Sequence, residues 1–178
     1  MEDKILNLVR GKSLLAPADL EIAKVIIPSK IVKETKKQLL SFSRGKEHFE
    51  GVVYWAGKEN KKGLLVTKVM VPKALATPVS FQVKALENAR IATALVKESL
   101  QIIAQVQTRP WGADVTCSIL DEEVGFMPHE GLVLIIVRDY ATKGIIPLIE
   151  QAGVYVFRQG SFLRLSGEQV IKFFKLTS

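Results

Sequence analysis

The stretch QTRPWGADVTCSILDEE, residues 107–123, decides how the chain is interpreted. It follows directly on the apolar segment IIAQVQ at residues 102–107, which we predict to be a short β-strand. Within the stretch, seven residues separate Pro110 from Ser118, and Asp121 follows three positions later. The question is which chemistry this spacing supports.

The elements on either side of the stretch predict a sheet packed against a helix. Before it, residues 80–101 predict a helix with Ser80 as N-cap, because apolar residues recur every three or four positions. This expected buried face consists of Phe81, Ala85, Ala89, Ala92, Val96 and Leu100. After it, residues 131–139 form the most apolar segment of the chain and predict a buried strand.

The remaining elements complete a mixed sheet flanked by helices. Ser29 is placed to begin a helix and Gly45 to end it, and Gln159 with Gly160 suits the turn of a hairpin. We predict strands at residues 20–28, 51–57 and 63–72, a hairpin at 153–166, and helices at 29–45 and 167–176. Without repeats or linkers, residues 1–178 are expected to form one domain of α/β (or α+β) class.

Composition indicates an ordinary globular protein. The chain is 48% hydrophobic and 24% charged, and no apolar run reaches the ~20 residues of a membrane span, so we expect no membrane association. The single Cys117 cannot form an internal disulfide, and the beginning of the chain does not look like a secretory signal, so a cytoplasmic location is expected. The net charge of +7 comes from residues 1–75, which hold 15 Lys and Arg against 8 Asp and Glu.

Two motifs together carry a resemblance to a known family. Glu50 and Gly51 lie early in the first predicted hairpin, and QTRP at residues 107–110 precedes Ser118 and Asp121. With the order of elements, these residues resemble the MPN/JAB (Mov34-like) domain family, whose catalytic members are JAMM metalloproteases that remove ubiquitin or ubiquitin-like tags. The resemblance implies a cytidine-deaminase-like sandwich with its core at about residues 20–166, a short N-terminal extension and a C-terminal helix.

The resemblance also implies a vestigial site. In catalytic members two histidines and an aspartate bind zinc, a glutamate is the general base for the zinc-bound water, and a serine helps to hold the oxyanion. Here Gln107 and Arg109 replace both histidines; an amide oxygen suits zinc poorly, and a guanidinium has no acceptor atom. We therefore expect no metal and no cofactor, with Asp121 as the remaining ligand position and Glu50 and Ser118 left without a catalytic role.

Arg109 is expected to take the place of the metal. If Glu50 and Asp121 face the pocket that holds zinc in catalytic members, two negative charges lie close together there. The guanidinium of Arg109 can then donate to one or both carboxylates. The alternative is an exposed loop cation. Trp111 stands at the rim of the expected cleft, where it could grip a partner peptide; alternatively it plugs the vacant pocket or packs on the sheet.

The other candidate ligands are His48, His129 and Cys117. His48 lies two residues from Glu50, so in a strand both side chains would share a face, which makes it the better substitute for a lost ligand. His129 is expected in a loop beside Pro128, without a ligand partner. Cys117 is expected to be a buried, inert thiol, because no Cys/His motif supports a nucleophile.

Three functions follow from these observations. The leading prediction is a non-catalytic MPN/JAB-like module that binds a ubiquitin-like protein, another MPN/JAB-like subunit or a second copy of itself. The first alternative is a divergent metal-dependent isopeptidase or peptidase that uses His48, Glu50 and Asp121. The second is nucleic-acid binding, which predicts that basic residues of the first half gather on one surface. These residues are Lys30, Lys33, Lys36, Lys37 and Lys46.

Overall fold

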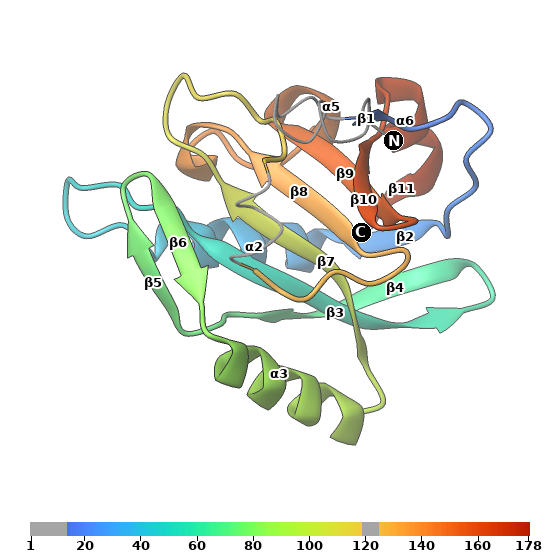
Figure 1. Ribbon diagram of the computed structural model, residues 1–178, viewed down its shortest axis with the longest axis horizontal. Helices are drawn as coiled ribbons and strands as arrows, with labels where there is room; N and C mark the ends of the chain where they lie inside the picture. The colour runs from blue at the N-terminus through green and yellow to red at the C-terminus, as the bar shows by residue number, and fades with distance from the viewer. Residues whose placement is uncertain (1–13, 119–124) are drawn as a thin grey trace, which may run out of the picture.

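Figure 1 shows the computed structural model of the chain, which describes residues 14–118 and 125–178. Within them, one curled, mixed sheet has nine strands in the order β1-β10-β9-β8-β7-β3-β4-β2-β11. The strands of this sheet are β1 (Leu14–Leu15), β2 (Val25–Pro28), β3 (Val52–Asn60), β4 (Gly63–Met70), β7 (Gln101–Thr108), β8 (Val133–Val137), β9 (Ala152–Arg158), β10 (Ser161–Arg164) and β11 (Phe174–Thr177). The prediction of a mixed α/β fold is confirmed.

Both faces of this sheet are covered. Val53 and Trp55 of β3 enter one hydrophobic core, and Val52 and Tyr54 enter the other, as the two-residue period of a strand requires. The first core is covered by α2 (Ser29–Leu40), α5 (Leu148–Gln151) and α6 (Gly167–Phe173). The second is covered by α3 (Ala85–Lys97) and by the separate hairpin of β5 (Ala74–Thr77) and β6 (Ser80–Val83). In the described part of the chain, no helix is long and apolar enough to cross a membrane.

Helix α2 is shorter than predicted. It ends at Leu40, and Gly45, predicted to end it, has a φ of +60° in a turn beyond it. Ser29 is the first helical residue and not the N-cap, because Pro28 occupies the capping position. The helix is fixed to the sheet by a buried hydrogen bond of 2.8 Å from Trp55 Nε1 to Thr35 Oγ1.

The predicted helix over residues 80–101 is wrong in its first part. Residues 80–83 form β6, and α3 begins at Ala85. Pro78 and Val79 make the turn between β5 and β6, and β6 then buries Phe81 and Val83 alternately. A segment this short can satisfy strand and helix spacing together, so the apolar pattern alone did not separate them.

The buried face of α3 also differs from the prediction. Glu87, Ile91 and Leu95 point into the protein, whereas Ala89 and Val96 are exposed. Ala85 is exposed as well, and Ala92 and Leu100 are half-buried. The larger branched side chains gain more from burial than the alanines do, and this sets the rotation of the helix.

The first predicted strand and the last predicted helix are both shorter than expected. The first predicted strand, residues 20–28, is reduced to β2. The predicted helix 167–176 ends at Phe173, and the chain continues as β11, which pairs in parallel with β2. Ser166 and Gln169 form a capping box at the start of α6, and Gln169 Nε2 also donates to Pro17 O at 2.7 Å. This last bond joins α6 to the segment that follows β1.

Both predicted hairpins of the main sheet are confirmed. Strands β3 and β4 pair in antiparallel fashion around a turn at Lys61 and Lys62, and β9 and β10 pair around Gln159 and Gly160. The last two residues have φ angles of 49° and 83°, which a two-residue hairpin turn requires. The most apolar predicted strand, residues 131–139, is confirmed with shorter bounds as β8, and the five residues of β8 are all buried.

Candidate functional site

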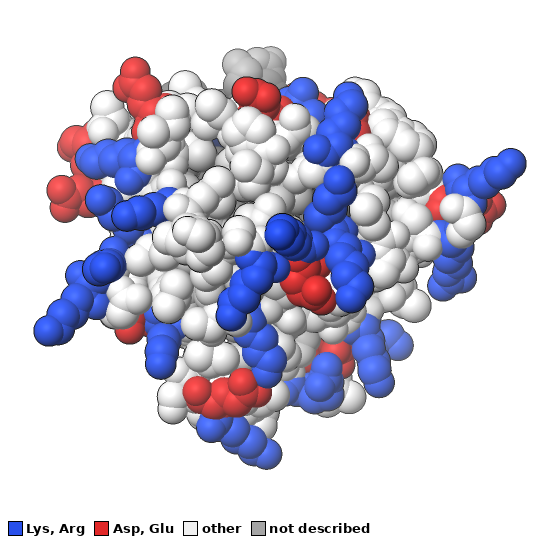
Figure 2. Space-filling view, turned by 180° about the vertical axis from the view of Figure 1, so that it is seen from behind, with Lys and Arg blue, Asp and Glu red and all other residues white. Residues whose placement is uncertain are grey.

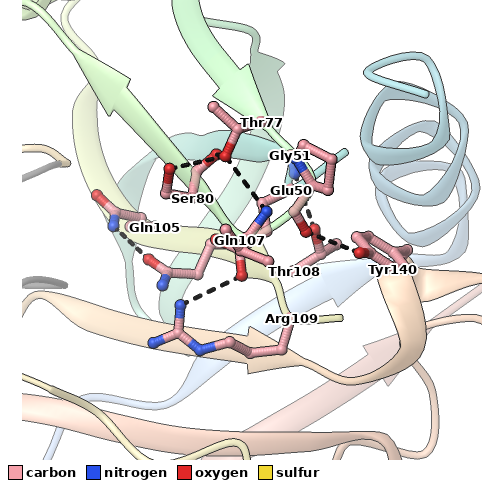
Figure 3. A network of polar contacts seen from close by, with 11 residues as sticks. Glu50, Gly51, Thr77, Ser80, Gln105, Gln107, Thr108, Arg109 and Tyr140 are labelled. Atoms are coloured by element: carbon pink, nitrogen blue, oxygen red, sulfur yellow. Dashed lines mark hydrogen bonds and ion pairs between the residues drawn. The ribbon is translucent and has the colours of Figure 1, made fainter. Parts of the chain in front are cut away.

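Polar side chains are buried where β7 ends, at the position the sequence indicated. Gln105 and Gln107 are two residues apart on β7 and therefore share a face, and both are almost fully buried. Gln105 Nε2 donates to Gln107 Oε1 at 2.8 Å (Figure 3). Gln105 Oε1 accepts from the backbone N–H of Phe126 at 2.7 Å. The pair fastens the segment at Phe126 onto the sheet. Gln105 was not predicted, although its two-residue distance from Gln107 could have indicated it.

Glu50 is held at the same place by backbone contacts from two directions. It is 1% exposed, and its N–H donates to the carbonyl of Thr77, at the end of β5, at 2.9 Å. The next residue, Gly51, donates to Thr108 Oγ1 at 2.8 Å and accepts from the N–H of Thr108 at 3.0 Å. The carboxylate is thus fixed between the β5–β6 hairpin and the end of β7.

Arg109 points toward Glu50 and away from bulk solvent. Its Nη1 lies 3.6 Å from Glu50 Oε1, and the two side chains are only 16% and 2% exposed (Figure 3). A buried carboxylate is costly unless a cation or hydrogen bonds compensate it, and the guanidinium supplies the positive charge. The predicted ion pair between Arg109 and Glu50 is confirmed, and the alternative of an exposed loop cation is wrong.

An unusual backbone turn places the residues beside Arg109. Asp139, Tyr140 and Ala141 have consecutive φ angles of 54°, 52° and 59°, a left-handed turn that costs roughly 1–2 kcal/mol per residue. Its N–H at Tyr140 donates to the carbonyl of Arg109 at 2.8 Å. Tyr140 Oη then donates to Pro78 O at 2.7 Å, at the tip of the β5–β6 hairpin. The turn therefore joins three segments that are far apart in sequence.

The carboxylate of Asp139 stabilises this turn. It pairs with Lys143 at 3.0 Å and accepts the backbone N–H of Gly112. The bond to Lys143, then the bond from Gly112, lower the pKa of Asp139 below its usual value, against the opposing effect of burial. Burial, then the negative charge of Glu50, raises the pKa of Tyr140.

Three aromatic rings, those of His48, Trp111 and Tyr140, pack against one another beside this turn. Trp111 packs edge-to-face on His48 at 4.4 Å and on Tyr140 at 5.0 Å between ring centroids, and His48 lies 5.4 Å from Tyr140. Trp111 remains 55% exposed, so it does not plug a buried pocket. His48 is not in a strand, and Ser43 Oγ lies 3.4 Å from its Nδ1. Tyr140 completes this cluster, and nothing in the sequence predicted it.

The donor atoms at this site do not suit zinc. Gln107 Oε1 already accepts a hydrogen bond from Gln105, and Arg109 brings a positive charge where a cation would lie. Across residues 14–118 and 125–178, no three His, Cys, Asp or Glu side chains are grouped as metal ligands would be. Asp121 lies outside the described residues, so the alternative ligand set of His48, Glu50 and Asp121 stays a prediction.

The other predicted residues lie beyond this centre. Cys117 is buried, as expected, and its N–H donates to Tyr155 Oη at 3.1 Å. Ser118 follows it and is half-buried. His129 is exposed in a loop next to Pro128, as predicted.

Four of the five lysines considered for nucleic-acid binding lie on α2, where Lys30, Lys33 and Lys37 are three and four residues apart on its exposed side. Figure 2 shows Lys and Arg side chains spread over one face of the molecule, with acidic side chains among them. Of the five, Lys36 is half-buried. The exposed ones are Lys30, Lys33, Lys37 and Lys46. This interleaving of charges favours a solvated surface over a continuous basic track.

Comparisons with known proteins show the fold alone. No protein-family model matches the chain, and no curated protein matches it. Among solved structures, the chain is similar to the solution structure of protein DSY2949 from Desulfitobacterium hafniense. The TM-score is 0.58 at 13% sequence identity, and the match covers 86% of this chain and 93% of that chain.

Proposed function

We propose that the chain is a metal-free, non-catalytic MPN/JAB-like domain that binds a partner protein. The observation that carries this proposal is the ion pair of Arg109 with Glu50, 3.6 Å apart in a nearly solvent-free site. A zinc hydrolase of this type needs a metal-bound water beside the glutamate. Here a guanidinium approaches the glutamate instead, so the charge that a metal would balance is balanced by the chain itself.

The buried amides support the same proposal. In the resemblance, Gln107 stands for a zinc ligand, and its amide oxygen is used by Gln105. Gln105 in turn accepts from the N–H of Phe126. The amide of Gln107 is therefore held by hydrogen bonds at the position where the family has a zinc ligand. Buried polar groups that are paired with one another hold a fixed geometry, which suits a binding scaffold. Such a network does not activate a water molecule, which hydrolysis would require.

The partner we propose is an extended peptide segment, such as the tail of a ubiquitin-like protein. Among the described strands, β6 pairs only with β5, so its other edge can accept a further strand. The hairpin tip is joined to Tyr140 through Pro78, and Tyr140 supports the exposed ring of Trp111. An exposed tryptophan on a rigid support near an open strand edge is suited to hold one side chain of such a segment.

The first test is zinc per chain, measured by elemental analysis of untagged protein. We expect near-zero zinc in the native chain and zinc gained by the double variant Gln107→His, Arg109→His. Stoichiometric zinc in the native protein, with a peptidase activity that Glu50→Ala abolishes, would establish the alternative of a metal-dependent enzyme.

Binding is tested by NMR titration with ubiquitin and with ubiquitin that lacks its C-terminal tail. We expect only the intact form to shift the amides of residues 80–83 and the indole N–H of Trp111. Trp111→Ala should weaken this binding, while the buried Trp55 gives an internal reference signal. Equal shifts with both forms would exclude recognition of the tail.

A further inference from the structure

Exposed apolar side chains gather on the β5–β6 hairpin and on α3. Leu75 is 62% exposed, Val79 73%, Leu86 83% and Val96 75%. Single exposed apolar residues are normal on a soluble protein, but a group of large ones marks a surface that contacts something else. All four lie between residues 75 and 96, two on the hairpin and two on α3.

The hairpin and the helix enclose a hollow of about 770 Å³. Figure 1 shows α3 beginning just beyond the end of β6 and running below β3. Leu75 and Gln82 form the hairpin wall, while Leu86, Ala89 and Thr93 form the helix wall. The opposite side of the hairpin carries Phe81 and Val83 into the core, so this hollow is distinct from the polar site at the end of β7.

The helix wall has the spacing of a helix–helix seam. Leu86, Ala89 and Thr93 of this wall, and Val96 beyond the hollow, are separated by three, four and three residues, which is the heptad pattern of positions that face a second helix. Thr93 Oγ1 donates to Ala89 O at 2.8 Å, so its hydroxyl is paired within α3. The two central residues are small, and small residues allow a second helix to approach closely.

The rim of the hollow is basic. Lys73 and Lys84 line it, and among the described residues neither forms an ion pair. Glu87 is the one carboxylate among the residues that line it; Arg90 pairs with it at 2.7 Å, and the N–H of Lys73 donates to it at 2.9 Å. A ligand therefore meets an apolar floor with positive charge at its edges.

We propose that this hollow, between α3 and the β5–β6 hairpin, binds an amphipathic helix of a partner protein that carries acidic residues beside its apolar stripe. The heptad spacing on α3 indicates that the partner segment is a helix, and the lysines indicate that it is acidic. A second copy of this chain fits less well, because an antiparallel pair of α3 helices would bring Lys84 close to Lys97 of the other copy.

The test uses two synthetic 21-residue helical peptides with the same Leu and Ala stripe. One carries Glu beside the stripe and the other Lys, and binding to the full chain is measured by fluorescence anisotropy. At low salt we expect the acidic peptide to bind at least ~10-fold more tightly, with the difference falling at 0.5 M salt. NMR shifts should fall on residues 74–97. Equal binding of the two peptides, or shifts elsewhere, would overturn the proposal.

Two exposed aliphatic residues, Leu86 and Ile171, provide a matched pair of variants. Leu86→Gln should reduce binding of the acidic peptide by at least ~5-fold, because it removes a seam residue without disturbing the core. Ile171→Gln, at a 68% exposed position on α6, should leave it unchanged. Equal losses in both variants would exclude this hollow, and a dimer in sedimentation that Leu86→Gln dissolves would assign it to a second copy. Trp111→Ala should have no effect on this binding, which separates it from the proposed peptide site.

Discussion

At the end of β7 polar side chains are buried, whereas on the outer side of α3 apolar side chains are exposed. In the first region the buried polar groups are paired: Gln105 with Gln107, and Arg109 with Glu50. In the second, Leu86 and Val96 are largely exposed to solvent in the isolated chain. The two regions are on opposite sides of the same β5–β6 hairpin.

The difference indicates how each region contributes. Burying a polar group costs free energy unless it is hydrogen-bonded or paired, so the first region is maintained by its internal contacts. An exposed apolar side chain adds little to the stability of the free protein, so the second region gains stability only when a partner covers it. Substitutions should therefore change stability in the first region and binding in the second.

The largest effect is expected for Arg109→Ala. It leaves the carboxylate of Glu50 buried without its cation, and we expect the free energy of unfolding at pH 7 to fall by about 3 kcal/mol in a urea titration. The double variant Glu50→Gln, Arg109→Ala should recover part of this loss, because the buried negative charge of Glu50 is then removed as well. Arg138→Ala removes a nearby exposed arginine and should have little effect. Equal effects of Arg109→Ala and Arg138→Ala would contradict the structural role of the ion pair.

A smaller loss is expected for Gln105→Leu. The change leaves the N–H of Phe126 and Oε1 of Gln107 without the bonds seen here, at a cost of about 2 kcal/mol. Amide hydrogen exchange at Phe126 should accelerate more than exchange in β8. Gln101→Leu, at an exposed position on the same strand, is the control. Unchanged protection of Phe126 would show that Gln105 does not hold this segment.

The part of this site that could be predicted lies at or directly beside the ends of strands β3 and β7. Gln107 and Arg109 follow from the end of an apolar strand, and Glu50 follows from the start of a hairpin. Tyr140 could not be predicted, because it reaches the site through a left-handed turn made by Asp139, Tyr140 and Ala141. None of these is glycine, so the sequence carries no signal for positive φ there.

The fold shows the same division. The strand at β8 and the turn at Gln159 and Gly160 were predicted because local composition alone determines them. The hairpin before α3 was missed, because its short strands continue the apolar spacing of the helix. The rotation of α3 was missed too, because it depends on which residues find room against the sheet, with Ile91 and Leu95 displacing the alanines. Such choices are tertiary and leave no local pattern.

The next prediction concerns Glu87 and the pH dependence of the free energy of unfolding. Its pKa is lowered from 4.5 to about 2, first by the hydrogen bond from Arg90 and against the effect of burial. A lowered pKa in the folded state means that the stabilisation is complete above pH 4.5 and is lost as the pH falls toward 2. Because the Arg90 side chain is largely exposed and solvent screens the pair, we expect this contribution to the free energy of unfolding to be small. Glu87→Gln should therefore flatten the fall in stability over this range, and curves of identical slope would contradict the assignment.

The smallest change in stability is expected for Leu86→Gln. The side chain is 83% exposed, so little apolar contact is lost, and the free energy of unfolding should stay within about 0.5 kcal/mol of the native value. Ile91→Ala, five residues further along α3 on its buried face, should by contrast cost about 3 kcal/mol. A large loss from Leu86→Gln would mean that this leucine is covered within the protein itself, which would remove the reason to assign the surface to a partner. A small loss together with weaker binding of the acidic helix would show that α3 has one face for folding and another for association.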